Sequence, residues 1–152
     1  GKEVRLFKTY YITCNSFEKD TNGNVTVVHC SYDPESKGGQ TPDGRKVRGT
    51  MHWVSASHGV KAEIRLYDLL FTKSNPNDVE EGGHFTDFLN PESLTIMEGV
   101  VEPELVNIGK EDRVQFMRQG FFCADHGDFT KEKPVYNRIV SLKDSWSKMQ
   151  KK

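Results

Sequence analysis

The sequence lacks the features that would place it in a membrane or outside the cell. No run of about eighteen apolar residues occurs in its 152 residues. The N-terminus also lacks the basic, apolar and small-residue order of a signal peptide. We therefore predict no membrane association and expect a cytoplasmic protein. The chain opens with Gly-Lys and at once enters the strand-like stretch EVRLF, which suggests a piece of a longer protein.

Cysteine is scarce, and metal and catalytic motifs are missing. Cys14, Cys30 and Cys123 form an odd set without CxxC spacing, which favours reduced, buried thiols over a disulfide framework or a zinc site. The five histidines never show HxxxH or HExxH spacing, so no metal site is predicted. The sequence has no GxSxG elbow, and its closest approach to a phosphate loop, KGGQTPDGRK, precedes a strand instead of a helix. We therefore predict no catalytic residue in this chain.

Charge is present but segregated, although the net charge is only −1. Residues 1–73 carry 11 basic and 8 acidic side chains, and residues 110–152 carry 10 basic and 6 acidic ones. The stretch 74–109 between them has 8 acidic side chains and no basic one. An acidic insert of this kind would allow the remainder to present a basic surface. An ordinary solvated loop explains the same pattern equally well.

Alternation of apolar and polar residues predicts β-strands through most of the chain. The alternating stretches are residues 3–13, 22–32, 45–56, 60–71 and 133–142. The pair Asn22-Gly23 stands at the start of the second stretch, between the two runs that alternate, and predicts a hairpin with a type I′ turn. About seven strands with few helical stretches predict an all-β barrel or sandwich. With 35% hydrophobic residues, the chain can bury a core as one domain or as two small barrels.

The segments between these strands are predicted to be loops and short pieces. Pro, Gly, Asn and Asp are frequent in residues 33–44 and 72–85, which predicts exposed loops. Residues 89–105 are apolar pieces cut by proline and glycine, which predicts short strands and turns. The polar residues 143–152 could form a helical turn that frays.

One stretch departs from the alternation of apolar and polar residues. In RVQFMRQGFF, Val114 and Phe116 alternate with polar neighbours, and Arg118 then falls on the apolar side of the pattern. A regular strand would point its guanidinium into the core, where an unpaired charge is strongly unfavourable. We therefore predict a bend near Gly120 that turns Arg118 outward.

Several long motifs resemble one family. The stretches KVRGTMHWVSA, EIRLYDLLF, QFMRQGFFCAD and EKPVYNR, in this order and spacing, are similar to the C-terminal anticodon-binding region of glutaminyl-tRNA synthetases. The resemblance runs from residue 3 to residue 146. The family consists of class I enzymes that join glutamine to its tRNA with ATP and magnesium. Its HIGH-like and KMSKS-like catalytic signatures do not occur in this sequence.

The resemblance implies a fold, partners and site residues. The chain would be the non-catalytic part of such a ligase, with no cofactor of its own, ATP and magnesium being bound by a catalytic half of the same protein. It would form two small β-barrels, one including residues 1–56 and one from residues 57–152 with the acidic insert 74–109. The partner would be the anticodon loop of glutamine tRNA, bound by a monomer. Family positions that approach the anticodon match Arg5, Gln115 and Arg118. A position between the last two, often acidic in the family, is Met117 here.

Other residues and other functions remain open from the sequence. Outward basic residues could hold the phosphates of the loop, or could serve only solubility; these are Arg45, Lys46, Arg48, Lys61 and Arg65. Tyr67, Phe121 and Phe122 could stack on bases, although a core or barrel interface is the simpler role. Alternative functions are a β-barrel module for RNA binding or protein assembly, and the equivalent tail of a glutamyl-tRNA synthetase.

Overall fold

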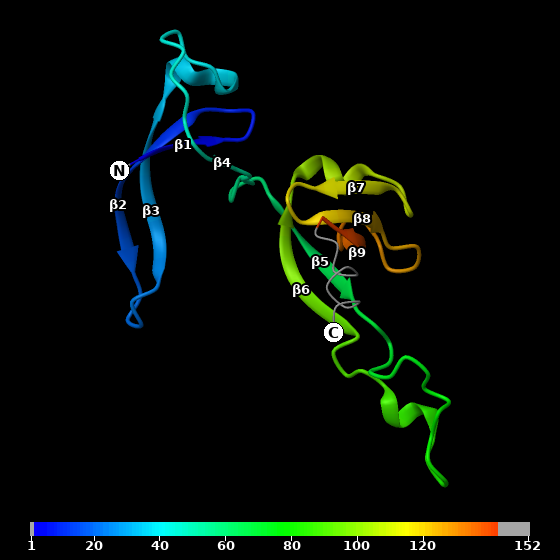
Figure 1. The fold of residues 1–152 in the computed structure, drawn as a ribbon. Helices are drawn as coiled ribbons and strands as arrows, with labels where there is room; N and C mark the ends of the chain where they lie inside the picture. Colours follow the sequence, from blue (N-terminus) through cyan, green and yellow to red (C-terminus); the bar gives the residue numbers. More distant parts are fainter. Residues whose placement is uncertain (1, 143–152) are drawn as a thin grey trace. The chain divides into compact units, whose positions relative to one another are not determined.

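The computed structural model describes residues 2–142 and divides the chain into two compact units. The first unit extends to Trp53 and the second begins at Val54. Each unit contains one β-sheet, and helix is confined to short 3-10 segments (Figure 1). The all-β prediction is therefore confirmed. Residues 143–152, where a helical turn is predicted, lie outside the described residues.

The first unit is a four-stranded sheet. The strands lie in the order β3-β2-β1-β4, and β4 runs parallel to β1. Their bounds are β1 Glu3–Leu6, β2 Tyr11–Lys19, β3 Val25–Asp33 and β4 Thr50–Met51. The single strand predicted over residues 3–13 is wrong, because the chain reverses after Leu6. There the Leu6 amide donates to the Tyr10 carbonyl over 2.9 Å, and Lys8 adopts a φ of 60°.

The predicted hairpin around Asn22 and Gly23 is confirmed as the β2–β3 pair, but its turn type differs from the prediction. Gly23 has a φ of 84°, whereas Asn22 is not in the left-handed region that a type I′ turn requires. Asp20 stabilises the turn, since its carboxylate accepts hydrogen bonds from the amides of Asn22 and Asn24 at 2.9 and 2.8 Å. A side chain before the turn thus shapes it.

The segment after β3 is more buried than its composition predicts. Residues Pro34–Gly39 form the 3-10 segment η1, and Ser36 within it is fully buried. The Ser36 hydroxyl accepts from the amide of Tyr11 at 2.7 Å and donates to the Asp33 carbonyl at 2.6 Å. Of the strand predicted over residues 45–56, only the two residues of β4 are observed. Gly49, which precedes β4, has a φ of 106°.

The second unit is a five-stranded sheet in the order β6-β5-β9-β8-β7, with β5 and β9 parallel. The predicted inward side of residues 60–71 is confirmed, since Ala62 and Ile64 are buried with Phe122 and Tyr136 in one cluster. Burial raises the pKa of Tyr136 to about 12, and its hydroxyl donates to the Leu105 carbonyl at 2.7 Å. The elements are β5 Val60–Tyr67, β6 Leu94–Val101, η3 Pro103–Asn107, β7 Arg113–Phe116, β8 Gly120–Ala124 and β9 Val135–Ser141.

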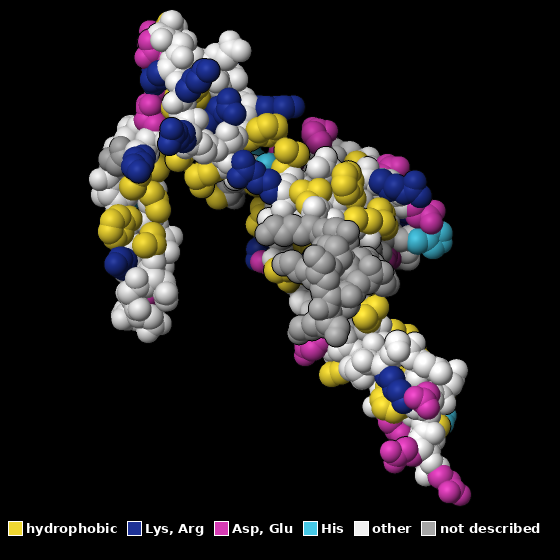
Figure 2. All heavy atoms as spheres, in the orientation of Figure 1, with side chains coloured by type: hydrophobic (Ala, Val, Ile, Leu, Met, Phe, Trp, Pro, Cys, Tyr) yellow, Lys and Arg dark blue, Asp and Glu magenta, His cyan; other side chains and the backbone are white. Residues whose placement is uncertain are grey.

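A long segment connects β5 to β6, and we name residues 68–93 the arm (Figure 1). An antiparallel bridge between Phe71 and Leu89 joins its two sides, and Phe85–Phe88 form the 3-10 segment η2. Acidic side chains gather at its far end (Figure 2). The acidic stretch 74–109 also contains the whole of β6, an eight-residue strand where the sequence predicts only short pieces.

Neither sheet is closed within residues 2–142. The first sheet has β3 and β4 as edge strands, and the second has β6 and β7. What is observed is therefore two open sheets, without the closure that defines a barrel. In the same part of the chain, no helix is long and apolar enough to cross a membrane.

Candidate nucleic-acid interface

The β7–β8 hairpin explains the broken pattern at Arg118. Strand β7 ends at Phe116, and the chain turns through residues 117–119, where the Gln119 amide donates to the Phe116 carbonyl over 2.9 Å. Arg118 has a φ of 65° at the third position of this turn, which is the left-handed position of a type II turn. The bend that the sequence predicts is therefore present, and it lies in the turn before Gly120. Arg118 is exposed instead of facing the core.

Gln115 and Arg118 both lie on this hairpin, one near the end of β7 and the other in the turn. Val114 and Phe116 pack toward the core, which leaves Gln115 exposed on the opposite face. Among residues 2–142, the side chains of Gln115 and Arg118 have no hydrogen-bonding or ion-pair partner. Both polar groups are thus available to a ligand.

Gly120 fixes the exit from the turn. It has a φ of 150° and begins β8, where it pairs with Ser141 of β9. A Cβ atom at this position would lie 2.5 Å from the Val140 carbonyl oxygen, which is closer than atoms can approach. Only glycine therefore allows β8 to pair this closely with β9 immediately after the turn.

Arg5 lies in the first unit, on β1, and is already partly engaged. Its Nε and Nη2 atoms donate to the Thr50 hydroxyl at 3.1 and 2.9 Å. Gly39 lies so close to its stem that a Cβ there would be 2.8 Å from the Arg5 Cδ atom. Arg5 lines an open hollow of about 440 Å³ together with Gln40 and Lys46. The side chain is thus held in place, and its Nη1 atom makes no hydrogen bond among the described residues.

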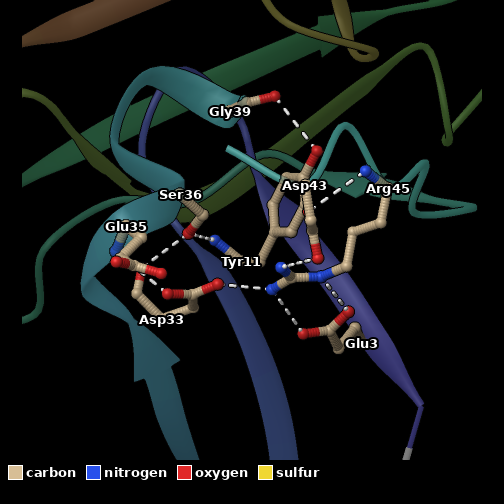
Figure 3. Close-up of polar contacts among 8 residues, drawn as sticks. All are labelled: Glu3, Tyr11, Asp33, Glu35, Ser36, Gly39, Asp43 and Arg45. Carbon is tan, nitrogen blue, oxygen red and sulfur yellow. Dashed lines mark hydrogen bonds and ion pairs between the residues drawn. The ribbon is translucent and has the colours of Figure 1, made fainter. Parts of the chain in front are cut away.

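Arg45 anchors the loop that follows η1 (Figure 3). Its guanidinium donates to the carboxylates of Glu3 at 3.1 Å and Asp43 at 3.0 Å, pairs with Asp33, and lies over the Tyr11 ring at 5.4 Å. The nearby Thr41 hydroxyl and hydrogen bonds from Arg45 lower the pKa of Asp43 to about 2. Glu3, with the two aspartates, raises the pKa of Arg45. This arginine is a structural link, and phosphate binding by it would require breaking three ion pairs.

Two further basic candidates are also neutralised. Arg65 contacts Asp128 at 2.6 Å, Glu63 at 2.7 Å and Asp125 at 3.3 Å. Hydrogen bonds to Asp128 and Glu63, Asp128 first, raise its pKa. Lys61 pairs with a glutamate across the β5–β6 pair at 3.0 Å. Lys46 and Arg48 differ, because both are exposed and neither has a partner within the part of the chain that the structure describes.

The aromatic candidates separate by burial. Phe122 is only 2% exposed and stacks on Phe116 with the ring centres 4.4 Å apart, so it belongs to the core. Tyr67 is 48% exposed, and its hydroxyl donates to the Asn137 side chain at 3.0 Å. Phe121 is 45% exposed and lies on the same face of the hairpin as Gln115.

The thiols are free, but the prediction that all are buried is wrong. Cys30 is exposed on β3, and Cys14 and Cys123 are half-buried. Strand β3 is exposed on nearly all of its residues, which the alternation pattern alone does not reveal.

Comparison with known proteins settles the family. Residues 50–125 match the family model described as the anticodon-binding domain of class I tRNA synthetases of the E and Q types. The chain belongs to this family. The matched region contains Gln115 and Arg118, whereas Arg5 precedes it.

Glutamine–tRNA ligases of several bacteria are similar to the chain over almost its full length. That of Vibrio vulnificus is 52% identical over 152 residues, which is 100% of this chain and 27% of the ligase. That of Photobacterium profundum is 51% identical over 149 residues, 98% of this chain and 26% of the ligase. That of Stutzerimonas stutzeri is 50% identical over 147 residues, 96% of this chain and 26% of the ligase. The chain thus spans about a quarter of the length of these relatives, and the predicted family is confirmed.

Proposed function

We propose that this anticodon-binding chain recognises the anticodon loop of glutamine tRNA as the non-catalytic part of a glutaminyl-tRNA synthetase. The observation that carries the proposal is the β7–β8 hairpin, where Gln115 and Arg118 are exposed without a protein partner in a domain of this family. The curated relatives, which are named glutamine–tRNA ligases, support glutamine as the amino acid concerned.

The chemistry of the two side chains suits an unpaired base. Proteins read single-stranded RNA loops by splaying bases out and bonding their exposed edges. The Gln115 amide both donates and accepts hydrogen bonds, whereas the Arg118 guanidinium only donates, in a fixed fork. Together they can match one base edge and leave an unsatisfied group opposite another. We assign them the middle anticodon base, and we assign Arg5 the first.

With anticodon recognition assigned to this chain, the chemical reaction belongs to another part of the enzyme. A catalytic half of the same protein would bind ATP and magnesium and attach glutamine to the tRNA. Among residues 2–142, no group of three or more His, Cys, Asp and Glu side chains that could hold a metal ion is found. We further propose that residues 1–56 and 57–152 contribute to two barrels, the first completed by additional strands. The enzyme would act as a monomer in the cytoplasm.

Binding of RNA hairpins to the 152-residue chain tests the proposal. One hairpin carries the glutamine anticodon loop, and a second differs only at the middle base. Arg118→Ala and Gln115→Ala are each expected to reduce the discrimination between the two hairpins by about 1–3 kcal/mol, the scale of one good base contact.

Lys131→Ala, which removes an exposed charge from the same unit, is the matched control and should leave the ratio unchanged. Equal affinity of the unaltered chain for both hairpins and for an unrelated RNA would point instead to a general RNA-binding or assembly module.

The glutamyl enzyme is the other candidate, because the family model covers both the E and the Q types. A hairpin with the glutamate anticodon loop separates the two. Tighter binding of that hairpin than of the glutamine hairpin would assign the chain to a glutamyl-tRNA synthetase.

A further inference from the structure

The exposed face of the β7–β8 hairpin holds more than the two residues above. Gln115 is the direct cross-strand partner of Phe121, and Arg113 is the partner of Cys123. Side chains of directly opposed residues in an antiparallel pair lie on the same face and contact one another. Arg113, Gln115 and Phe121 therefore share one face, with Arg118 in the turn at its end.

Phe121, like Tyr67, is an exposed aromatic ring in this sheet, and it lies beside Gln115. Its neighbour Phe122 is buried in the core, whereas Phe121 remains 45% exposed. A large apolar side chain left open beside an amide that has no partner suits a flat ligand with a polar edge. A nucleobase has this chemistry, since every base has a stacking face and a hydrogen-bonding edge.

We propose that Phe121 is the stacking surface for the base whose edge Gln115 reads, and that Arg113 binds a phosphate of the same nucleotide. This inference rests on the proposed function and adds two residues to its site. Arg113 is exposed on the face of Gln115, two residues before it, and has no partner among the described residues. Its charge is thus free for the RNA backbone, unlike the charges of Arg45 and Arg65.

An RNA hairpin that lacks only the middle anticodon base tests the stacking role. With the intact glutamine hairpin, Phe121→Leu is expected to weaken binding to the 152-residue chain by roughly 5- to 150-fold, the range for loss of one aromatic stack. With the abasic hairpin the same variant should bind as the unaltered chain does. Phe121→Trp, which keeps a stacking surface, should restore binding of the intact hairpin.

Controls separate stacking from a purely structural effect. Ile96→Ala removes another exposed apolar side chain, from β6, and should leave both affinities unchanged. Circular dichroism establishes that each variant is folded. An equal loss on the intact and abasic hairpins would overturn the stacking role, as would no loss on either.

Loss of a phosphate contact by Arg113 should change RNA affinity in a different way from loss of a base stack. Arg113→Gln should weaken binding of all hairpins alike and lower the slope of log affinity against log salt by about 1, as expected for a phosphate contact. An unchanged slope would overturn that assignment. If the unaltered chain discriminates at the middle base while these variants behave like it, the inference fails and the proposed function survives. If the unaltered chain does not discriminate, the proposed function itself fails.

Discussion

Arg118 has a backbone conformation that its side chain disfavours. Its φ of 65° is in the left-handed region, which costs a non-glycine residue roughly 1–2 kcal/mol. Glycine would occupy this turn position without that cost. Strained residues of this kind concentrate at functional sites, where the side chain matters more than stability. The position of the strain therefore agrees with the role we propose for Arg118.

Replacing Arg118 with glycine is expected to separate stability from recognition. Arg118→Gly should raise the free energy of unfolding by about 1 kcal/mol, because the strain is relieved at an exposed position. It should also abolish the contribution of the guanidinium to base discrimination. Chemical denaturation and the paired hairpins measure the two effects.

The comparison variant is Arg118→Ala, which removes the same guanidinium but keeps the left-handed strain. It should lose discrimination equally without gaining stability. If glycine gives no more stability than alanine, the left-handed conformation does not persist in solution.

At the scale of elements, the position of β8 depends on Gly120. Gly120→Ala would place a Cβ 2.5 Å from the Val140 carbonyl and enforce a side chain at a φ of 150°. We expect a loss of about 1–3 kcal/mol in the free energy of unfolding. Gly127→Ala is the control, since its new Cβ would meet only the Asp125 carboxylate at 3.6 Å. Similar unfolding midpoints for the two variants would contradict the close β8–β9 pairing.

The register of β2 and β3 makes a chemical prediction. Cys14 and Cys30 are direct cross-strand partners. Opposed residues in antiparallel strands have Cα atoms about 4.5–5.5 Å apart, within the range that a disulfide spans. Oxidised glutathione should therefore convert the two thiols into one disulfide, with release of two molecules of reduced glutathione.

Mass spectrometry of peptides after digestion identifies the bond. Cys30→Ser should prevent its formation. Absence of this disulfide under conditions that oxidise exposed thiols would show that the register of this hairpin is different.

Alternation predicts the strand β5, which has one buried face, and also the exposed strand β3, but it fails over residues 45–56. Strand β5 alternates because Ala62 and Ile64 enter the core while Lys61 and Tyr67 face outward. The stretch 45–56 alternates equally well, yet it is mostly irregular, because Arg45 is bound by carboxylates from β1 and β3. Alternation alone cannot report such ion pairs between residues far apart in the chain.

Part of the candidate site was also predictable from the sequence. The parity of Arg118 indicates a bend, and the family resemblance selects Gln115 and Arg118. The pairing of Gln115 with Phe121 was not predictable, because it depends on which residues form the turn. Arg113 could have been found from sequence, since it precedes Gln115 by two residues on the same side of the alternation.

At the scale of the whole chain, the division into two compact units predicts separate unfolding transitions. Arg45→Met should lower the stability of the first unit only, because it breaks three ion pairs there and leaves the Arg65 cluster intact. Differential scanning calorimetry should show one transition shifted and the other unchanged. A shift of both transitions would indicate that the units unfold together.

Acid should affect the first unit through the same cluster. The pKa of Asp43 is about 2, below the ordinary value of 3.8, and hydrogen bonding to Arg45 also lowers the pKa of Asp33. A lowered carboxylate pKa contributes stability that is present above pH 3.8 and is lost as the pH falls toward about 2. The unfolding transition of the first unit should therefore move to lower temperature as the pH falls over this interval. In Arg45→Met, the stability of the first unit should depend less on pH.

The arm between β5 and β6 has a practical consequence for studying the molecule. The Phe71–Leu89 bridge and the bond from the Asn90 amide to the Leu70 carbonyl close its base, and turns near residues 75–83 are held by local bonds. Exposed loop tips with such local bonding accept insertions without disturbing the rest of a domain. A small fluorescent tag placed between Glu81 and Gly82 would then report on RNA binding while both sheets keep their registers.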